Sequence, residues 1–176
     1  MNRVIFLDRD GTINVDHGFV YAVNQWQFTE RAPEALKRLQ DEGFKLAIIT
    51  NQSGIAYDYY TENDMHALHE YMREELKKNG VAIDAIAYCP HDRSGDCECR
   101  KPKTGMAGQI EQQIGQINYR MSWTIGDKTA DAQFGRKLNT HTALIRSKYW
   151  EEKELAEKPE LIVDSLWEFA GTINPN

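Results

Sequence analysis

Short apolar runs alternate along the chain with longer segments in which apolar residues recur every three or four positions. The runs Val4–Leu7 and Lys45–Ile49 are rich in branched aliphatic residues and predict buried strands. Further strands are predicted over residues 82–88, 122–125, 142–145 and 161–163. Helices are predicted between them, around residues 32–39, from 61 to 76, over 105–114 and 130–138, from Glu151, and over 165–170.

Two of these helices carry recognisable end signals. Thr61 followed by Asp64 is a variant of the capping box, with Asp in place of Glu or Gln, and Gly80 lies just past the expected end of the same helix. Pro33 suits a first helical turn, and Gly43 is a plausible stop. Strands that alternate with helices imply right-handed crossovers and a parallel sheet covered on both faces.

The expected fold is therefore α/β, a three-layer Rossmann-like sheet with helices on both faces. With 176 residues and 41% hydrophobic residues, the chain has material for one sizeable core, so we expect a single domain over residues 1–176 without a large cap domain. The apolar runs are too short for a membrane span or a signal peptide, which predicts a cytoplasmic protein without a membrane partner. A monomer is the default expectation.

The charge balance narrows the class of partner. Lys and Arg number 21 against 27 Asp and Glu, and the net charge of −6 comes without any basic tract. Such a chain lacks the electrostatic character of a general nucleic-acid binder, so we expect no nucleic-acid partner. Any phosphate that the protein handles must be met by a local basic pocket.

Polar clusters follow several of the predicted strands or the loops that those strands open. Because the carboxyl ends of parallel strands line one crevice, clusters distant in sequence can converge there. Each cluster alone has an ordinary explanation as a turn, a helix cap or a surface charge. Four at the same level of the sheet indicate one site: Asp8 with Asp10, Thr50 with Asn51, Arg100 with Lys101, and Asp127 with Lys128.

These residue types match the demands of phosphoryl transfer. A divalent cation held by Asp8 and Asp127 draws a phosphate dianion towards a carboxylate that otherwise repels it, while Lys101 and Thr50 take up charge on the equatorial oxygens. Asp8 can then attack phosphorus. Asp10, two residues later on a turn, can protonate the leaving oxygen and later deprotonate the attacking water.

The three cysteines lie close together, which excludes a disulfide framework spread through a secreted fold. Cys89, His91, Cys97 and Cys99 instead form a C-x-H-x5-C-x-C pattern suited to a closed tetrahedral zinc site. The alternative, three buried structural thiols, fits poorly with the many polar residues between them. A structural zinc ion would fix this loop and present Arg100 and Lys101 to the substrate.

The segment Asp8-Arg9-Asp10-Gly11-Thr12 resembles the signature of the haloacid dehalogenase (HAD) superfamily of phosphohydrolases. Thr50 resembles that family's second-motif hydroxyl residue, Lys101 its third-motif lysine, and Asp127 with Asp131 its acidic pair. The resemblance implies an aspartyl-phosphate intermediate and a catalytic Mg²⁺, and it gives the expected Mg²⁺ ligands as Asp8, Asp10 and Asp127.

Within the superfamily, the zinc loop is similar to those of the D,D-heptose 1,7-bisphosphate phosphatases and the histidinol-phosphate phosphatases. The segment Ile13–Val20 looks like the substrate loop of the heptose enzymes, which would remove the 7-phosphate in the synthesis of lipopolysaccharide core precursors and retain the 1-phosphate. The likeness implies substrate contacts at Asp16, His17, Gly18, Phe19, Asn51, Gln52, Ser53, Arg100 and Lys128.

The chain also departs from the heptose pattern. Phe19 stands where many heptose enzymes have Tyr, and Tyr57-Asp58 stands where Arg-Gly is usual. A hydroxyl group and a positive charge are therefore missing near the site. His66 and His69 are one helical turn apart, and the simplest interpretation makes them exposed i,i+4 neighbours of Glu70 and Arg73.

Two other classes stay open on the sequence. A receiver domain also places acids, a Thr or Ser and a Lys at the carboxyl ends of a parallel sheet, but Asp10 and the zinc loop have no role in such a switch. A zinc-finger-like binding module is disfavoured because no basic helix follows the cysteines. Histidinol phosphate, or another small phosphorylated metabolite, is the alternative substrate.

Overall fold

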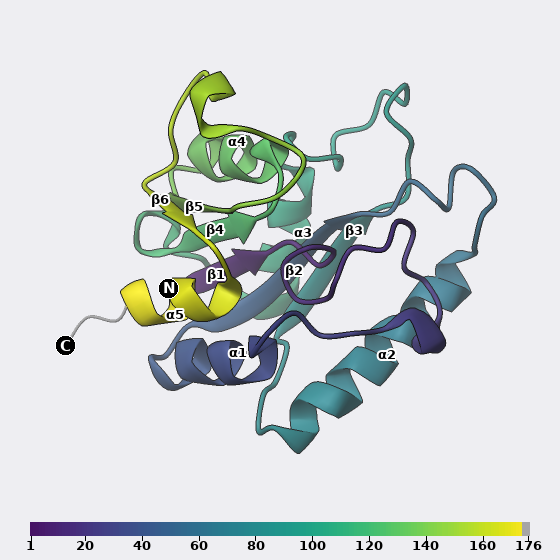
Figure 1. Cartoon of the computed structure of the whole chain (residues 1–176), viewed down its shortest axis with the longest axis horizontal. Coiled ribbons are helices and arrows are strands. Elements are labelled where there is room, and N and C mark those ends of the chain that lie inside the picture. Colours follow the sequence, from purple (N-terminus) through teal and green to yellow (C-terminus); the bar gives the residue numbers. More distant parts are fainter. Residues whose placement is uncertain (174–176) are drawn as a thin grey trace.

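The computed structural model describes residues 1–173 and contains the predicted parallel sheet (Figure 1). All neighbouring strands are parallel, in the order β3-β2-β1-β4-β5-β6. β1 therefore lies inside the sheet, and later strands are added on both sides of it. This strand order confirms the Rossmann-like prediction. The strands are β1 (Val4–Leu7), β2 (Lys45–Asn51), β3 (Ala85–Cys89), β4 (Trp123–Gly126), β5 (His141–Ile145) and β6 (Leu161–Val163).

Helices cover both faces of this sheet, which gives the three layers (Figure 1). Alternate residues of β1 point to opposite faces, as a strand requires: Ile5 and Leu7 join one core, and Val4 and Phe6 join the other. The first core is closed by α1 (Ala32–Asp41), α2 (Glu62–Lys78) and α5 (Leu166–Thr172), and the second by α3 (Gly105–Ile114) and α4 (Thr129–Lys137).

The predicted helix ends are confirmed where the sequence carried a clear signal. The Asp64 backbone N–H donates to the Thr61 hydroxyl over 3.1 Å, and the Thr61 backbone N–H donates to the Asp64 carboxylate over 2.8 Å. These two hydrogen bonds form the capping box at the start of α2. Gly43, just after α1, has a φ of 84°, a conformation that favours glycine.

Two strand boundaries and one helix depart most from the prediction. β3 begins at Ala85 rather than at 82, and β2 continues to Asn51, so that the Thr50-Asn51 pair lies on the strand itself. The helix predicted from Glu151 is wrong: the structure has only one 3-10 turn, Glu152–Glu154. This segment is charged on every side and has no apolar stripe to bury, and so short a helix is not stable in water without packing.

No helix within residues 1–173 is long and apolar enough to cross a membrane. The long connections that leave the carboxyl ends of the strands carry the polar clusters. They include the loop between β1 and α1 and the loop between β3 and α3, which projects from the sheet (Figure 1).

Candidate active site

Three carboxylates converge where β1 and β4 end. Asp8 directly follows β1, Asp127 directly follows β4, and Asp131 lies in the first turn of α4. One carboxylate oxygen from each lies within 4.8 Å of the other two, and all three residues are buried. Because β1 and β4 are hydrogen-bonded neighbours in the sheet, their carboxyl ends bring the acids together.

The Lys101 ammonium group lies at the centre of this cluster. Its Nζ donates to Asp8 Oδ1 over 2.8 Å, to Asp131 Oδ1 over 2.6 Å and to the carbonyl of Ile49 over 2.8 Å. Burial lowers the pKa of Lys101, but Asp131 and Asp8 outweigh that effect, so the pKa is raised and the ammonium stays charged. Asn51 braces the Lys101 backbone, accepting its N–H over 3.0 Å.

The acidic cluster carries one more negative charge than the neighbouring lysines neutralise. Three carboxylates face the ammonium groups of Lys101 and Lys128, and Lys128 Nζ lies 2.9 Å from Asp127 Oδ1. Burial and the neighbouring Asp8 raise the pKa of Asp127 to about 7. Hard carboxylate oxygens crowded into one buried place are the donor set that a divalent cation such as Mg²⁺ prefers, so these residues fit such an ion.

Two glycines make this close approach possible. A Cβ atom on Gly11 would lie 2.1 Å from Asp127 Oδ2, and a Cβ atom on Gly126 would lie 2.1 Å from Asp131 Oδ2. Gly11 also has a φ of 81°. Any side chain at either position would therefore push a carboxylate out of the cluster.

Asp10 is not one of the three clustered acids, and its role as a Mg²⁺ ligand stays a prediction. Arg9 Nη2 donates to both of its oxygens, over 2.9 and 3.1 Å. Asn14 Nδ2 donates to Oδ1 over 2.9 Å, and Gln52 Nε2 donates to Oδ2 over 3.2 Å. These contacts fix the orientation of Asp10, and the third clustered acid is Asp131 instead.

Arg9 and His69 form a buried support behind Asp10. The Arg9 side chain is fully buried, and its Nη1 lies 3.2 Å from His69 Nε2. The expectation that His69 is exposed is wrong, because α2 turns this residue inward and leaves it 3% exposed. Burial, and then the Arg9 charge, lower the pKa of His69 to about 3, so the ring is neutral and accepts from Arg9.

A hollow of about 260 Å³ opens above these residues, and Asp8, Asp10, Lys101 and Asp131 line it. Most of the substrate-binding residues predicted from the sequence line it as well: Asp16, Gly18, Phe19, Asn51, Gln52, Ser53, Arg100 and Lys128. His17 is exposed and does not line the hollow, and Thr50 is buried beneath Gln52, whose Nε2 donates to the Thr50 hydroxyl over 2.9 Å.

Sequence reasoning missed three polar residues that line the hollow, Tyr60, Arg93 and Tyr149. Tyr60 Oη donates to Gln52 Oε1 and so orients the amide that contacts Asp10. Tyr149 comes four positions after Ile145, the last residue of β5. The rule that sites gather at strand ends could have pointed to Tyr149, but no motif marks it.

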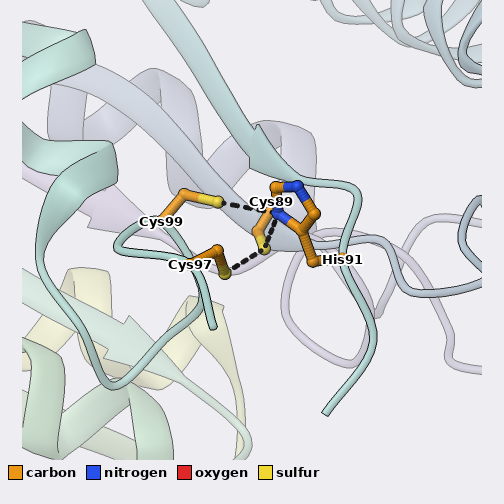
Figure 2. A group of neighbouring side chains, drawn as sticks. All are labelled: Cys89, His91, Cys97 and Cys99. Atoms are coloured by element: carbon orange, nitrogen blue, oxygen red, sulfur yellow. Dashed lines mark hydrogen bonds between the residues drawn. The ribbon is translucent and has the colours of Figure 1, made fainter. Parts of the chain in front are cut away.

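The predicted zinc ligands also converge. Figure 2 shows the side chains of Cys89, His91, Cys97 and Cys99 directed at one another. Cys89 Sγ lies 3.6 Å from both His91 Nδ1 and Cys97 Sγ, and His91 Nδ1 lies 3.3 Å from Cys99 Sγ. Ligand atoms of a tetrahedral zinc ion are about 3.5–3.8 Å apart, given bond lengths of about 2.0–2.3 Å, so the cluster fits zinc.

Comparison with known proteins agrees with this geometry. The family model described as "Polynucleotide kinase 3 phosphatase" matches residues 3–157. The D-glycero-beta-D-manno-heptose-1,7-bisphosphate 7-phosphatase of Haemophilus ducreyi is 38% identical over 98% of both chains. The enzyme of that name from Pasteurella multocida is 44% identical over 84% of this chain and 83% of its own.

A solved structure points the same way. The D,D-heptose 1,7-bisphosphate phosphatase from B. bronchiseptica, complexed with magnesium and phosphate, superposes with a TM-score of 0.86 at 28% identity. The superposition covers 97% of each chain. The chain therefore belongs to the heptose-1,7-bisphosphate 7-phosphatase family of HAD-like phosphatases.

Proposed function

We propose that this protein removes the 7-phosphate of D-glycero-D-manno-heptose 1,7-bisphosphate, in the synthesis of lipopolysaccharide core precursors. The observation that carries the proposal is the buried Lys101 ammonium, which joins Asp8 to Asp131 at the floor of the hollow. That arrangement suits a nucleophile whose phosphorylated form is stabilised by a fixed positive charge. The names of the relatives supply the sugar.

In the first half of the reaction, a carboxylate oxygen of Asp8 attacks phosphorus, and the bond to the sugar oxygen breaks. The Asp10 carboxyl gives its proton to that leaving oxygen, and an aspartyl phosphate remains on Asp8. Lys101 Nζ takes up charge on a phosphoryl oxygen. Thr50 lies beneath this site and accepts the Gln52 amide, so it would bear on the phosphoryl group by positioning Gln52.

In the second half, the Asp10 carboxylate takes a proton from water, and the water oxygen attacks phosphorus. The bond to Asp8 breaks, and inorganic phosphate leaves with the carboxylates restored. Asp10 is suited to both roles because Arg9, Asn14 and Gln52 hold its carboxylate in one place. Mg²⁺, when bound at Asp8 and Asp127, supplies positive charge that draws the substrate dianion to these acids.

We assign zinc to Cys89, His91, Cys97 and Cys99, as a structural ion with no open ligand position. The support is the mutual approach of the four side chains (Figure 2). This loop also bears on the substrate, because Arg100 Nη1 donates to the His91 carbonyl over 3.0 Å. Fixing the loop therefore fixes the direction from which Arg100 enters the hollow.

Arg100 is the proposed anchor for the phosphate that is not cleaved. It lines the hollow with Asp8 and Asp10, and its fork of donors can bind phosphate oxygens in pairs. Arg100→Ala should raise KM for the bisphosphate more than KM for a monophosphate, because only the bisphosphate has a second dianion to lose. Equal effects on both substrates would contradict this placement.

The decisive test compares kcat/KM for heptose 1,7-bisphosphate and for histidinol phosphate, with phosphorus NMR of the heptose product. We expect a clear preference for the bisphosphate and release of the phosphate on carbon 7. A preference for histidinol phosphate, or release of the phosphate on carbon 1, would overturn the proposal. The cytoplasmic location and the monomeric state stay predictions.

A further inference from the structure

The segment Ser147–Trp150 folds back over the turn between β4 and α4. The Ser147 hydroxyl donates to the backbone carbonyl of Asp127 over 2.6 Å, and the indole N–H of Trp150 donates to the same carbonyl over 3.1 Å. Two side chains from one short segment thus bind a single carbonyl of a clustered acid. This double attachment fixes the segment at the edge of the hollow.

Between these two attachments, Tyr149 reaches across the hollow to the loop after β1. Its hydroxyl donates to Asp16 Oδ2 over 2.7 Å, although the two residues lie 133 positions apart. The other oxygen, Asp16 Oδ1, accepts the backbone N–H of Gly18 over 2.9 Å. The Asp16 carboxylate is therefore held at one oxygen by its own loop and at the other by the distant Tyr149.

Lys128 lies beside Asp16 and Tyr149, and these three side chains form one wall of the hollow. Its Nζ lies 4.4 Å from the centre of the Tyr149 ring and 3.5 Å from Asp16 Oδ2. A cation over an aromatic face and beside a carboxylate is attracted by both groups. Tyr149 thus fixes the Asp16 carboxylate, an acceptor of hydrogen bonds, and the Lys128 ammonium, a donor. Lys128 also contacts Asp127 in the acidic cluster.

The exposure of Tyr149 shows that packing alone does not explain its place. The residue is 46% exposed and lines the hollow together with Asp16 and Lys128. The Tyr149 hydroxyl donates its proton to Asp16, but its oxygen keeps lone pairs that can accept a hydrogen bond from a ligand. A hydroxyl, a carboxylate and an ammonium held in one wall suit a leaving group that carries several hydroxyl groups.

We propose that Tyr149 is a specificity-determining residue that fixes Asp16 and Lys128 so that this wall binds the hydroxyl groups of a polyhydroxylated leaving group. The inference rests on the proposed function for the reaction and adds to it the side of the site that recognises the sugar. It assigns the Ser147–Trp150 segment as the part of the chain that builds this recognition wall.

The test is Tyr149→Phe, which removes one hydroxyl and keeps the ring beside Lys128. The ratio of kcat/KM for heptose 1,7-bisphosphate to kcat/KM for p-nitrophenyl phosphate should fall about tenfold, through a higher KM for the sugar, because one hydrogen bond to a charged group is lost. The matched control is Tyr119→Phe. Tyr119 also bonds a carboxylate, that of Glu111 over 3.4 Å, but lies outside the hollow, so the ratio should stay constant.

A double-mutant cycle tests whether Tyr149 acts through Asp16. Asp16→Asn should lower the same ratio, and adding Tyr149→Phe should lower it little further, because the two changes break one contact. Fully additive effects, or an unchanged ratio in Tyr149→Phe, would overturn the inference and leave the proposed function intact. If the wild type does not hydrolyse heptose bisphosphate, the proposed function fails, and the same ratio measured with fructose 1,6-bisphosphate still decides the inference.

Discussion

Acid should destabilise this protein through His69, because the ring is buried and neutral beside a positive charge. His69 is 3% exposed, and its Nε2 lies 3.2 Å from Arg9 Nη1. Burial first, and Arg9 second, lower its pKa from 6.5 to about 3. The unfolded chain therefore binds a proton at this ring at a pH where the folded protein does not.

The sign and size of the effect follow from that difference. The contribution of His69 is fully present above pH 6.5 and is lost as the pH falls towards the folded pKa. At pH 5, about 1.5 pH units below the unfolded pKa, the loss is about 2 kcal/mol, since each unit is worth about 1.4 kcal/mol. For a chain of this length, that corresponds to a melting temperature lower by about 4–8 °C.

The assay is urea unfolding at pH 8 and pH 5 for the wild type and for His69→Gln, which keeps an acceptor for Arg9 and cannot be protonated. The variant should lose about 2 kcal/mol less than the wild type between the two pH values. Carboxylates titrate equally in both proteins and cancel. His66→Gln, a change at an exposed histidine on the same helix, should lose as much as the wild type. An equal loss in His69→Gln and the wild type would refute the reasoning.

Three further outcomes test the site. Asp8→Asn should abolish turnover with the fold intact, and near-wild-type activity in this variant would exclude Asp8 as nucleophile. Asp10→Asn should lower kcat about 10²- to 10⁴-fold in steady-state assays. Elemental analysis should find one tightly bound zinc per chain, and Cys97→Ser should lower both melting temperature and activity; fully stable protein free of zinc would exclude the ion. Gly126→Ala should remove most activity, because its Cβ would lie 2.1 Å from Asp131 Oδ2. The control Gly108→Ala, with nothing within 4 Å of its Cβ, should keep full activity. An active Gly126→Ala would show that the Asp131 carboxylate is dispensable.

Local patterns determined most of the fold in advance. Strand and helix periodicity is set by the backbone geometry of a few neighbouring residues, so β1, α1 and α3 could be located from their own segments. Thr61 and Asp64 bond within a single turn, and the start of α2 was predictable for the same reason. The convergence of Asp8, Lys101 and Asp127 was also predictable, because parallel strands bring their carboxyl ends to one edge.

What each side chain contacts across the molecule was decided only by tertiary packing. In the folded structure α2 places His69 against Arg9, and Arg9, Asn14 and Gln52 bind the Asp10 carboxylate. The contact of Tyr149 with Asp16 joins segments 133 positions apart, and no local pattern encodes it. The sequence by itself determined which chemistry gathers at the sheet edge, because that depends on strand order and local periodicity. Which oxygen meets which proton there depends on packing between distant segments, and only the folded structure decided it.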